Sequence, residues 1–427
     1  MTKNTPYIIS VLIPALNESG NIKELIGRIK NKLSLITDHF EIIVVDGGSH
    51  DNTQELARLS GAAVIKQHEK GYGAALKEGI SMVQGEYIIT MDADFSHDPY
   101  FIQEMWNKRD LSQVTIASRY VSCGSSDAPF IRNFLSRILN RMFSLLLHIP
   151  IKDFSSGFRM YKRDILQSVK LETNDYEVLE EILIKLYCEG YHIAEIPFHY
   201  SARQSGKSKA HVLGLMWKYL RTLWRMWKLR NSVKSADYDS RAHDSKIWLQ
   251  RYWQRSRYKI IQHMLRDITG SVADIGCGSS KIIQHNSMLC GLDIKLNKLR
   301  YVRRLNPKVL QGDIFHLPFK NNSLDGLVCS EVIEHIPQDK RIFEEFNRVL
   351  KTGGILVIGT PDYAKRTWRF IEFFYNLILP NAYGSEHITQ YTGDSLSRLL
   401  ISEGYTILET EYICNSELIL KVKKITA

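Results

Sequence analysis

Two aspartates separated by a single residue, Asp92 and Asp94, directly follow the apolar run 87–90. Carboxylate oxygens are hard ligands, and two of them at the end of one strand can hold Mg²⁺ or Mn²⁺ against a diphosphate. The Asp-x-Asp pattern alone is common among proteins, so its position after a buried strand is what gives it weight. The spacing therefore predicts a divalent-metal site at Asp92 and Asp94.

Other polar residues follow two more apolar runs. Glu18 comes shortly after the run 7–14, and Asp46 ends the run 41–46. Because α/β sheets bind ligands at the carboxyl ends of their parallel strands, an aspartate there can accept hydrogen bonds from a base or a ribose. The alternative is a structural role in capping a helix, which Asn17 and Asp51 could also fill.

A second set of candidate residues begins with Gly276 and Gly278, which follow a short apolar run. Glycines after a strand let the backbone come close to a ligand. A dinucleotide-binding fingerprint would need a third glycine where Lys281 stands, which counts against that cofactor. Asp293 ends the next apolar run at a spacing suited to ribose hydroxyls, and 312–314 (Gly-Asp-Ile) end a third run.

The candidate residues fall in two regions of the chain, and in each region short apolar runs alternate with helical patterns. The first region is expected to hold strands 7–14, 41–46, 62–66 and 87–92 and helices 22–35, 53–59 and 73–83. The second is expected to hold strands 272–275, 309–310, 326–330 and 355–359. This alternation predicts an α/β fold class, with mostly parallel sheets covered by helices. We place the domains at 1–232 and 246–427, with a polar linker at 233–245 and a helix at about 246–268.

Composition narrows the class of protein. The 427 residues are 44% hydrophobic and 24% charged, which excludes disordered, collagen-like and polytopic membrane proteins. No apolar stretch reaches the roughly 20 residues of a spanning helix, and the first residues lack the apolar core of a signal peptide. The cysteines form no Cys-x-x-Cys pair, so we expect free thiols in a reducing compartment and no zinc site.

The net charge of +10 comes largely from one segment, because no acidic residue lies between Glu195 and Asp237. Within it, 211–230 is typical of a helix with an apolar side and a basic stripe beside it. The apolar side comprises Leu213, Met216, Trp217, Leu220, Leu223, Trp224 and Trp227, and the stripe comprises Lys218, Arg221, Arg225 and Lys228. A second amphipathic run, 131–147, contains Arg132, Arg137 and Arg141.

Such a helix suits the surface of an anionic membrane. The alternative is a helix packed against the other domain, with its basic residues solvated. Nucleic acid is not expected as a partner, because no nucleic-acid-binding motif accompanies the charge.

Taken together, the segments of the first region resemble a family 2 glycosyltransferase of the GT-A fold, and within it the dolichol-phosphate mannosyltransferase type. The resemblance runs from about residue 8 to residue 231. The matching segments are 70–75 (Lys-Gly-Tyr-Gly-Ala-Ala), 91–99 (Met-Asp-Ala-Asp-Phe-Ser-His-Asp-Pro), 118–120 (Ser-Arg-Tyr), 153–159 (Asp-Phe-Ser-Ser-Gly-Phe-Arg) and 203–209 (Arg-Gln-Ser-Gly-Lys-Ser-Lys).

The resemblance implies a nucleotide-sugar site made of Pro14, Leu16, Glu18, Val44, Asp46, Asp92, Ala93, Asp94, Arg119, Arg203 and Lys209. Within this set, Asp92 and Asp94 would hold the metal and donor diphosphate, and Asp94 and Arg119 would be catalytic. Arg132 and Ser136 match positions that receive the acceptor phosphate. Leu16 stands where the family usually has Tyr, and Gly47 where it often has a second Asp, so the base that is read stays open.

The chemistry of such a site follows from its parts. A lipid phosphate is already an anion near neutral pH, so no strong general base is needed. The metal and the cationic side chains would stabilise charge on the departing nucleoside diphosphate. An in-line attack would invert the sugar carbon.

The second region resembles a class I S-adenosylmethionine-dependent methyltransferase over about residues 250–424. Further matching segments are 325–328 (Asp-Gly-Leu-Val), 331–336 (Glu-Val-Ile-Glu-His-Ile) and 349–355 (Val-Leu-Lys-Thr-Gly-Gly-Ile). The resemblance implies a donor site of Asp274, Gly276, Gly278, Asp293, Asp313 and Ile314. In it the glycines would face the amino-acid portion, Asp293 the ribose and Asp313 the adenine. Ser280 and Thr352 depart from the usual glycine and proline.

Methyl transfer is a direct displacement, in which an enzyme mainly aligns an acceptor oxygen or nitrogen with the methyl group. Glu334, His335 and His387 are candidate bases, and each also has a structural interpretation. We favour His387 as the catalytic residue, because we expect 384–391 to form a lid. The run 369–379 is a candidate apolar lid or membrane contact.

The sequence therefore predicts a bifunctional enzyme that is cytoplasmic and peripheral, at the inner face of the membrane. Its first domain would transfer a hexose from a nucleotide sugar to a polyprenyl or dolichyl phosphate. Its second domain would methylate a glycan or lipid intermediate. The alternative is a glycosyltransferase for a soluble or polysaccharide acceptor, with a second domain that only binds a ligand or partner.

Overall fold

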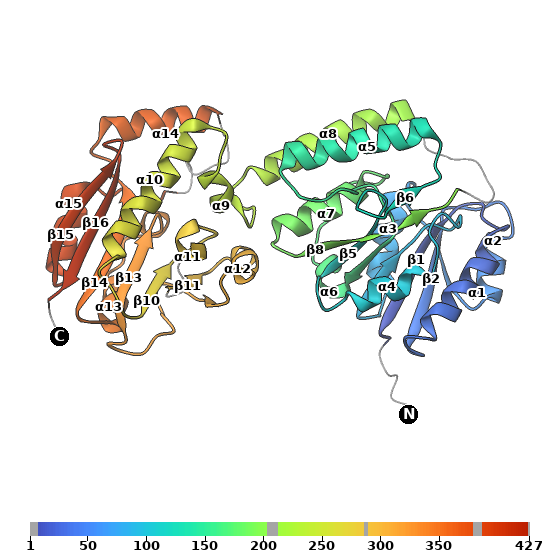
Figure 1. Ribbon diagram of the computed structural model, residues 1–427, viewed down its shortest axis with the longest axis horizontal. Coiled ribbons are helices and arrows are strands. Elements are labelled where there is room, and N and C mark those ends of the chain that lie inside the picture. Colours follow the sequence, from blue (N-terminus) through green and yellow to red (C-terminus); the bar gives the residue numbers. More distant parts are fainter. Residues whose placement is uncertain (1–6, 203–211, 286–288, 379–386, 426–427) are drawn as a thin grey trace. The chain divides into compact units, whose positions relative to one another are not determined.

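A computed structural model of the chain describes residues 7–202, 212–285, 289–378 and 387–425 (Figure 1). The chain divides into two compact units. Unit 1 takes up the chain to Arg230 apart from residues 188–190, and unit 2 takes up those three residues and the chain from Asn231 onward.

Unit 1 is built on a seven-stranded sheet with strand order β3-β2-β1-β4-β7-β5-β8. Its strands are β1 (Ile9–Ala15), β2 (Phe40–Asp46), β3 (Ala63–Lys66), β4 (Tyr87–Thr90), β5 (Val114–Ser118), β7 (Arg159–Lys162) and β8 (Ile193–Pro197). All neighbours pair in parallel except β7, which is antiparallel to both β4 and β5. A separate short pair joins β6 (Ser125–Ser126) to β9 (His199–Tyr200).

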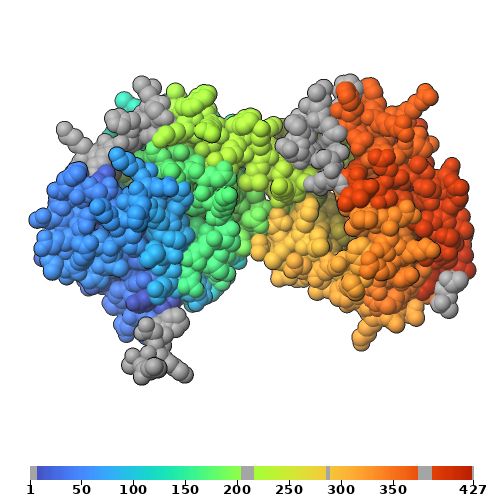
Figure 2. Space-filling view, turned by 180° about the vertical axis from the view of Figure 1, so that it is seen from behind, coloured from blue at the N-terminus to red at the C-terminus, as the bar shows by residue number. Residues whose placement is uncertain are grey.

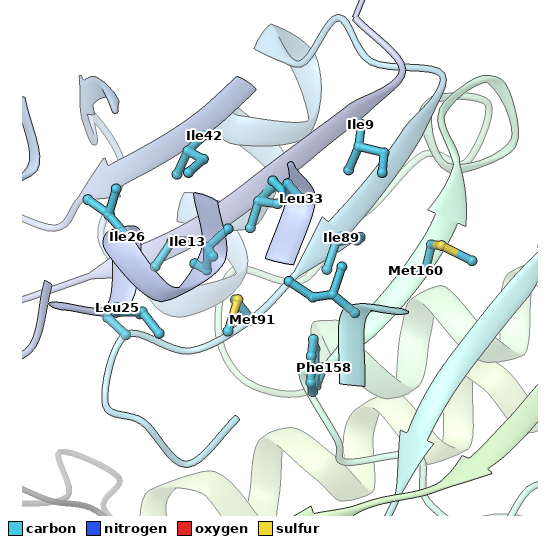
Figure 3. Packing of buried hydrophobic residues seen from close by; sticks show 14 of the residues in the cluster. Ile9, Ile13, Leu25, Ile26, Leu33, Ile42, Ile89, Met91, Phe158 and Met160 are labelled. Carbon is cyan, nitrogen blue, oxygen red and sulfur yellow. The ribbon is translucent and has the colours of Figure 1, made fainter. Parts of the chain in front are cut away.

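Helices cover the sheet of unit 1, and their apolar stripes explain where they pack. They are α1 (Ile22–Leu33), α2 (Thr53–Leu59), α3 (Tyr72–Met82), α4 (Phe101–Asn107), α5 (Phe130–Leu147), α6 (Arg163–Gln167), α7 (Val178–Cys188) and α8 (Val212–Arg230). In α1, Leu25, Ile26 and Leu33 recur at helical spacing and share one buried cluster with Ile9 and Ile13 of β1 (Figure 3). Burying each such side chain stabilises the fold by about 1.5–3 kcal/mol.

Unit 2 contains a second seven-stranded sheet, with strand order β12-β11-β10-β13-β14-β16-β15. Its strands are β10 (Val272–Ile275), β11 (Leu289–Asp293), β12 (Val309–Gln311), β13 (Leu324–Ser330), β14 (Leu350–Pro361), β15 (Tyr405–Ile413) and β16 (Glu417–Lys424). β16 pairs antiparallel with β14 and β15, and the other neighbours are parallel.

The helices of unit 2 are α9 (Tyr238–His243), α10 (Trp248–Leu265), α11 (Lys281–His285), α12 (Leu296–Arg303), the short 3₁₀ helix η1 (Ile333–His335), α13 (Lys340–Val349), α14 (Arg366–Ile378) and α15 (Gly393–Ser402). Two α/β units with largely parallel sheets confirm the predicted fold class. The strands and helices that the sequence predicts are present, and their ends differ by a few residues.

The segment 233–245, which we predicted as a linker, belongs to unit 2 instead. It contains α9 and buries several of its residues. Its charged composition suggested solvent exposure, but Asp239 is partly buried, with 15% of its side chain exposed, and its Oδ2 accepts a hydrogen bond from Lys298 Nζ at 2.6 Å. Removal from water raises the pKa of the Asp239 carboxyl, but the charge and hydrogen bond of Lys298 lower it more. The pKa of Asp239 therefore lies below its ordinary value. Composition alone does not show whether a charged side chain is solvated or paired with a residue far along the chain.

Neither long amphipathic helix is a membrane span. The predicted runs 211–230 and 131–147 correspond to α8 and α5, which lie side by side in unit 1 (Figure 1). Arg230, at the end of α8, is fully buried and donates to the carbonyl oxygen of Leu147 at 2.9 Å, which fixes the two helix ends together. Among the described residues, no helix is long and apolar enough to cross a membrane.

Candidate active sites

The predicted metal ligands of unit 1 lie at the edge of the sheet where β1, β2 and β4 end. β1 pairs in parallel with both β2 and β4, so the loops that follow these strands emerge at the same edge. Asp92 Oδ1 accepts a hydrogen bond from the Tyr72 hydroxyl at 3.2 Å. Asp94 Oδ1 accepts from the amide and the hydroxyl of Ser96, at 3.1 and 2.5 Å. The two carboxylates are therefore held in place by their own loop and by α3.

The side chain of His97 contacts the loop that holds Asp92. Its Nδ1 accepts the amide proton of Asp92 at 2.9 Å, and its Nε2 lies 3.8 Å from Asp92 Oδ2. Burial lowers the pKa of the imidazole, against the opposing pull of Asp92 and Asp94. His97 is therefore neutral, with its proton on Nε2 toward the carboxylate. His97 lies within the matching segment 91–99, and no role was predicted for it.

A cleft of about 1430 Å³ opens above these carboxylates. Most of the predicted residues in the described part of unit 1 line it: Pro14, Leu16, Glu18, Asp92, Ala93, Asp94, Arg119, Arg132 and Ser136. Asp92 is partly accessible, with 33% of its side chain exposed, whereas Asp94 is almost fully buried. Both acidic residues line the cleft and are therefore its candidate ligands for a divalent ion.

Val44 does not line this cleft, contrary to the prediction. Side chains of a strand alternate between the two faces of a sheet, so Val44 packs into the core with Ile42 while Val45 faces the cleft. The matching motif identified the strand end correctly but not the face.

Asp46 lies beneath the cleft rather than in its lining. Its Oδ2 accepts from the amides of Gly48 and Ser49, at 3.1 and 3.0 Å, and from Gln54 Nε2 at 2.7 Å. Its Oδ1 is buried and has no hydrogen-bond partner among the described residues. Asp46 therefore shapes the Gly47–Gly48 turn, which does line the cleft.

Neither residue that the capping alternative named is an N-cap, because the N-caps of α1 and α2 are Asn21 and Asn52. Asp51 Oδ1 accepts from the amide of Thr53, the first residue of α2, at 3.1 Å. Asn17 instead ties two loops together, since its Oδ1 accepts from the amide of His50 at 2.8 Å.

Arg119 is held by a buried partner. Its Nε and Nη2 donate to the two oxygens of Asp153 at 2.8 and 2.7 Å, and Nη2 also donates to Ser155 Oγ at 2.8 Å. Burial opposes the charge on Arg119, but Asp153 outweighs burial and raises its pKa. The guanidinium is thus a fixed cation at the cleft wall, and Asp153 partly neutralises its charge. The pairing with Asp153 was not predicted from the sequence, because Asp153 lies 34 residues away.

The predicted acceptor-phosphate residues lie next to this pair on α5. Ser136 Oγ is 3.2 Å from Ser155 Oγ, and Ser155 also contacts Arg119. Arg132 is exposed, with its guanidinium over the ring of Tyr200 at 5.8 Å. The structure therefore brings Arg119, Arg132 and Ser136 to one wall of the cleft. Arg203 and Lys209, which we also predicted, lie outside the described residues.

Beyond this wall the cleft becomes apolar. Its lining there comes from α5 and α8: Ile131, Leu135, Ile138, Leu139, Met142, Met216 and Leu220. The same two helices also carry large apolar side chains that are exposed: Phe130, Ile131, Phe134, Leu135, Ile138, Met216, Trp217, Leu220, Trp224 and Trp227. A polar end and an apolar end thus belong to one continuous cleft.

The basic stripe of α8 divides into two kinds of residue. Lys218 pairs with Asp175 at 2.8 Å, and Arg225 pairs with Glu172 at 2.8 Å. Both pairs lie within unit 1. Arg221 and Lys228 are exposed, and Lys228 lies over the ring of Trp224 at 3.5 Å. Two residues of the predicted stripe are therefore paired within unit 1, and Lys218, although paired, is exposed like Arg221 and Lys228.

Two tyrosines at the cleft had no predicted role. Tyr72 and Tyr176 stack with ring centroids 4.9 Å apart, and Tyr72 reaches Asp92. Gly71, just before Tyr72, has φ +114°, and a Cβ there would lie 2.1 Å from the carbonyl oxygen of Asn174. The signal for this contact was the segment 70–75, in which glycines flank Tyr72.

In unit 2, the glycine loop follows β10 at the carboxyl edge of the sheet. Gly276 and Gly278 both adopt positive φ, +69° and +52°, which glycine tolerates best. A Cβ on Gly278 would lie 2.6 Å from Asp239 Oδ2, so α9 closes the back of the loop. The predicted glycines are thus required by the local backbone.

Asp293 ends β11 beside this loop. Its Oδ2 accepts from the amide of Gly278 at 2.7 Å, and its Oδ1 accepts from the amide of Lys295 at 2.7 Å. Asp274 is buried, and burial together with the charge of Asp293 raises its pKa to about 8. Both oxygens of Asp293 thus hold backbone amides, which fixes the carboxylate at the loop.

Asp313 and Ile314 follow β12 at the same edge. Asp313 is exposed, and its Oδ1 accepts from the amide of Phe315 at 3.1 Å. Ile314 is buried in the core of unit 2. The structure therefore assembles the predicted donor residues from β10, β11 and β12 at one edge.

The three candidate bases meet after β13. The rings of His335 and His387 are 4.9 Å apart, and Glu334 is fully buried beside them. Burial and His335 lower the pKa of His387 to about 4, so its imidazole is neutral near pH 7. In the run 369–379, Phe370 and Phe373 of α14 are exposed, and the side chains from 374 onward lie outside the described residues. Figure 2 shows one face of unit 2, coloured from yellow to red along the chain.

Comparison with known proteins identifies both halves. Residues 10–170 match the Glycosyl transferase family 2 model, and residues 273–358 match a Methyltransferase domain model. Both resemblances seen in the sequence motifs are thereby confirmed, and so is their fusion in one chain.

Curated relatives match the first half. A dolichol-phosphate mannosyltransferase of Pyrococcus furiosus is 34% identical over 235 residues, which cover 53% of this chain and 65% of that protein. An undecaprenyl-phosphate 4-deoxy-4-formamido-L-arabinose transferase of Shewanella sediminis is 26% identical, covering 49% and 63%. A dolichyl-phosphate hexose transferase of Haloferax volcanii is 28% identical, covering 49% and 89%. The chain thus spans less than two thirds of the length of the first two relatives.

Proposed function

We propose that this chain, which joins a glycosyltransferase family 2 domain to a methyltransferase domain, transfers a hexose from a nucleotide sugar to a polyprenyl or dolichyl phosphate. The methyltransferase domain then methylates a glycan or lipid intermediate, with S-adenosylmethionine as the donor. The main support for a lipid acceptor is the lining of the cleft in unit 1. This lining combines the carboxylates of Asp92 and Asp94 with apolar side chains of α5 and α8. The names of the relatives point to the same acceptor class.

The polar end of the cleft fits a metal-bound nucleotide sugar. Asp92 and Asp94 would hold Mg²⁺ or Mn²⁺, which would offset charge on the diphosphate leaving group. The loop contacts from Tyr72, Ser96 and His97 orient these carboxylates before substrate arrives. Such preorganisation lowers the cost of reorganising the site during the reaction.

The acceptor phosphate fits the wall formed by Arg119, Arg132 and Ser136. Arg119 cannot turn freely, because Asp153 holds two of its nitrogens. Arg132 is exposed and unconstrained by an ion pair in the described structure, so it supplies the fuller positive charge. The phosphate oxygen would attack in line with the departing diphosphate and invert the sugar carbon.

The exposed surface of α5 and α8 supports the proposed membrane location. Apolar side chains such as Phe130 and Trp217 are exposed on these helices next to Arg221 and Lys228. Aromatic and basic residues together suit the interface of an anionic bilayer. Because the lipid-binding wall lies on the same two helices, a carrier could enter the cleft from the bilayer. All six cysteines are free, which fits the inner, reducing side of the membrane.

The methyltransferase half would take its donor at the carboxyl edge of β10, β11 and β12. Gly276 and Gly278 would let the amino-acid portion approach, Asp293 would accept from the ribose, and Asp313 with Ile314 would lie near the adenine. When bound, the donor supplies an electrophilic methyl group on a sulfonium. The chain's own residues bind that donor and align the acceptor with it.

Transfer assays with defined acceptors test this proposal. Full-length protein with anionic vesicles that contain polyprenyl phosphate, a panel of nucleotide sugars and Mn²⁺ should form a labelled, organic-extractable glycolipid. Glycosylation of water-soluble acceptors only, with none of the lipid phosphate, would refute the assignment and favour a soluble or polysaccharide acceptor.

A further inference from the structure

Three side chains with metal-ligand atoms meet in unit 2: Glu334, His335 and His387. One ligand atom from each lies within 4.8 Å of the other two. Glu334 and His335 lie in η1 directly after β13, whereas His387 comes from a loop far along the chain. Ligand atoms around one ion at about 2.0–2.2 Å lie about 3–4.5 Å apart, so a small closure would let all three bind one ion.

Two atoms of this cluster are buried without a partner. Glu334 is 0% exposed; its Oε2 accepts from the Thr360 hydroxyl at 3.3 Å, but its Oε1 has no hydrogen-bond partner in the described structure. His387 Nε2 is likewise buried and without a partner there. A buried polar atom that stays without a hydrogen-bond partner destabilises the fold. A cation would satisfy a carboxylate oxygen and an imidazole lone pair together.

The orientation of His387 suits a metal ligand. The Tyr363 hydroxyl donates to Glu372 Oε1 at 3.2 Å and lies 2.6 Å from His387 Nδ1. In the tautomer in which Nδ1 donates to the Tyr363 oxygen and the hydroxyl donates to Glu372, the lone pair of His387 lies on Nε2. Histidines that bind metals are commonly oriented by such a hydrogen bond through the second nitrogen.

The cluster also lies next to the predicted donor loop. A Cβ on Gly276 would be 2.3 Å from the side chain of Val332, two residues before Glu334. β13, which leads to η1, pairs in parallel with β10, which leads to the glycine loop. The three side chains therefore stand where a methyl acceptor would meet the donor.

We propose that Glu334, His335 and His387 hold a divalent transition-metal ion, such as Mn²⁺, Co²⁺ or Zn²⁺, which selects a hydroxyl group of the acceptor for methylation. Two imidazoles and one carboxylate favour these ions over Mg²⁺, which prefers all-oxygen ligands. A hydroxyl bound to such an ion loses its proton more readily. The role in methyl transfer rests on the proposed function, whereas the binding site itself does not.

The methyl transfer balances without a further reactant. The bond from the acceptor oxygen to the methyl carbon forms as the methyl–sulfur bond breaks. The sulfonium takes the bonding pair and leaves as a neutral thioether, and the hydroxyl proton passes to water. His387 is then a ligand rather than the general base that the sequence suggested.

Manganese binding tests the site directly. The full chain should carry Asp92→Asn and Asp94→Asn, so that unit 1 does not compete for the ion. Titration with Mn²⁺, followed by electron paramagnetic resonance of the free ion, should show one bound ion per chain. His387→Gln in this background should weaken binding at least tenfold, whereas the matched change His263→Gln, at a histidine 53% exposed on α10, should not.

Three results decide the proposal. Failure of the background protein to bind Mn²⁺, or equal affinity in the His387→Gln variant, overturns it. Glu334→Gln repeats the test if His387→Gln misfolds, and retained S-adenosylmethionine binding by calorimetry shows that a variant is folded. If the parent binds Mn²⁺ at this site but no S-adenosylmethionine, the proposed methyl transfer fails while the metal site stands.

Discussion

The exposed aromatic residues of α8 give the sharpest test of membrane association. Trp217 and Trp224 are 75% and 59% exposed on the outer side of this helix. Fully burying a large apolar side chain contributes about 2 kcal/mol. Inserting the exposed part of both rings into a bilayer interface should therefore contribute about 2–3 kcal/mol.

Replacing both residues, as Trp217→Ser with Trp224→Ser, should weaken binding to anionic vesicles about 30- to 100-fold, since about 1.4 kcal/mol corresponds to a tenfold change. Vesicle flotation across a lipid concentration series measures this shift. The matched control is Trp248→Ser, because Trp248 is 66% exposed on α10 of unit 2 and should leave binding unchanged.

The charges of the same helix should separate into two groups. Arg221→Gln with Lys228→Gln should lower vesicle binding, and more so at low salt, because exposed charges are screened by ions. Arg225→Gln should instead destabilise unit 1, since Arg225 pairs with Glu172 and Glu181. A parent protein that does not float with anionic vesicles at low salt, or a double tryptophan variant that floats as well as the parent, would refute the interfacial role of α8.

Three further changes probe the interior of each unit. Asp94→Asn should cut sugar transfer by orders of magnitude and spare methylation, measured by nucleoside-diphosphate release; undiminished transfer, or full activity of the parent in excess chelator, contradicts the metal assignment. Asp293→Ala should weaken S-adenosylmethionine binding about tenfold to hundredfold, because it removes a charged acceptor that also anchors Gly278; equal affinity by calorimetry would sink this placement. Burial raises the pKa of Glu180 to about 8, so the folded chain keeps a proton that the unfolded chain releases above about pH 4.5, and stability is lost as pH rises toward 8. Glu180→Gln should flatten this loss in urea unfolding between pH 5 and 8, and an unchanged slope would show that Glu180 is not the titrating group.

Much of the fold could be predicted from local sequence. Strand ends place Asp92 and Asp94 at a sheet edge, because the period of a strand and the turn that follows it are encoded by neighbouring residues. The same holds for α8, whose apolar and basic residues recur at helical spacing, and for Gly276 and Gly278, whose positive φ is a local requirement.

Other features depended on partners far along the chain. Only the folded structure pairs Arg119 with Asp153, turns Val44 into the core and Val45 to the cleft, and pairs Asp239 with Lys298. Likewise, Glu334 and His387 are brought together by tertiary contacts next to His387, where the amide of Ile388 donates to the carbonyl oxygen of Glu334 at 2.7 Å. A residue's type and spacing set which interactions it can make, but burial and charge pairing are set by whichever distant residue packs against it, and that choice belongs to the tertiary structure.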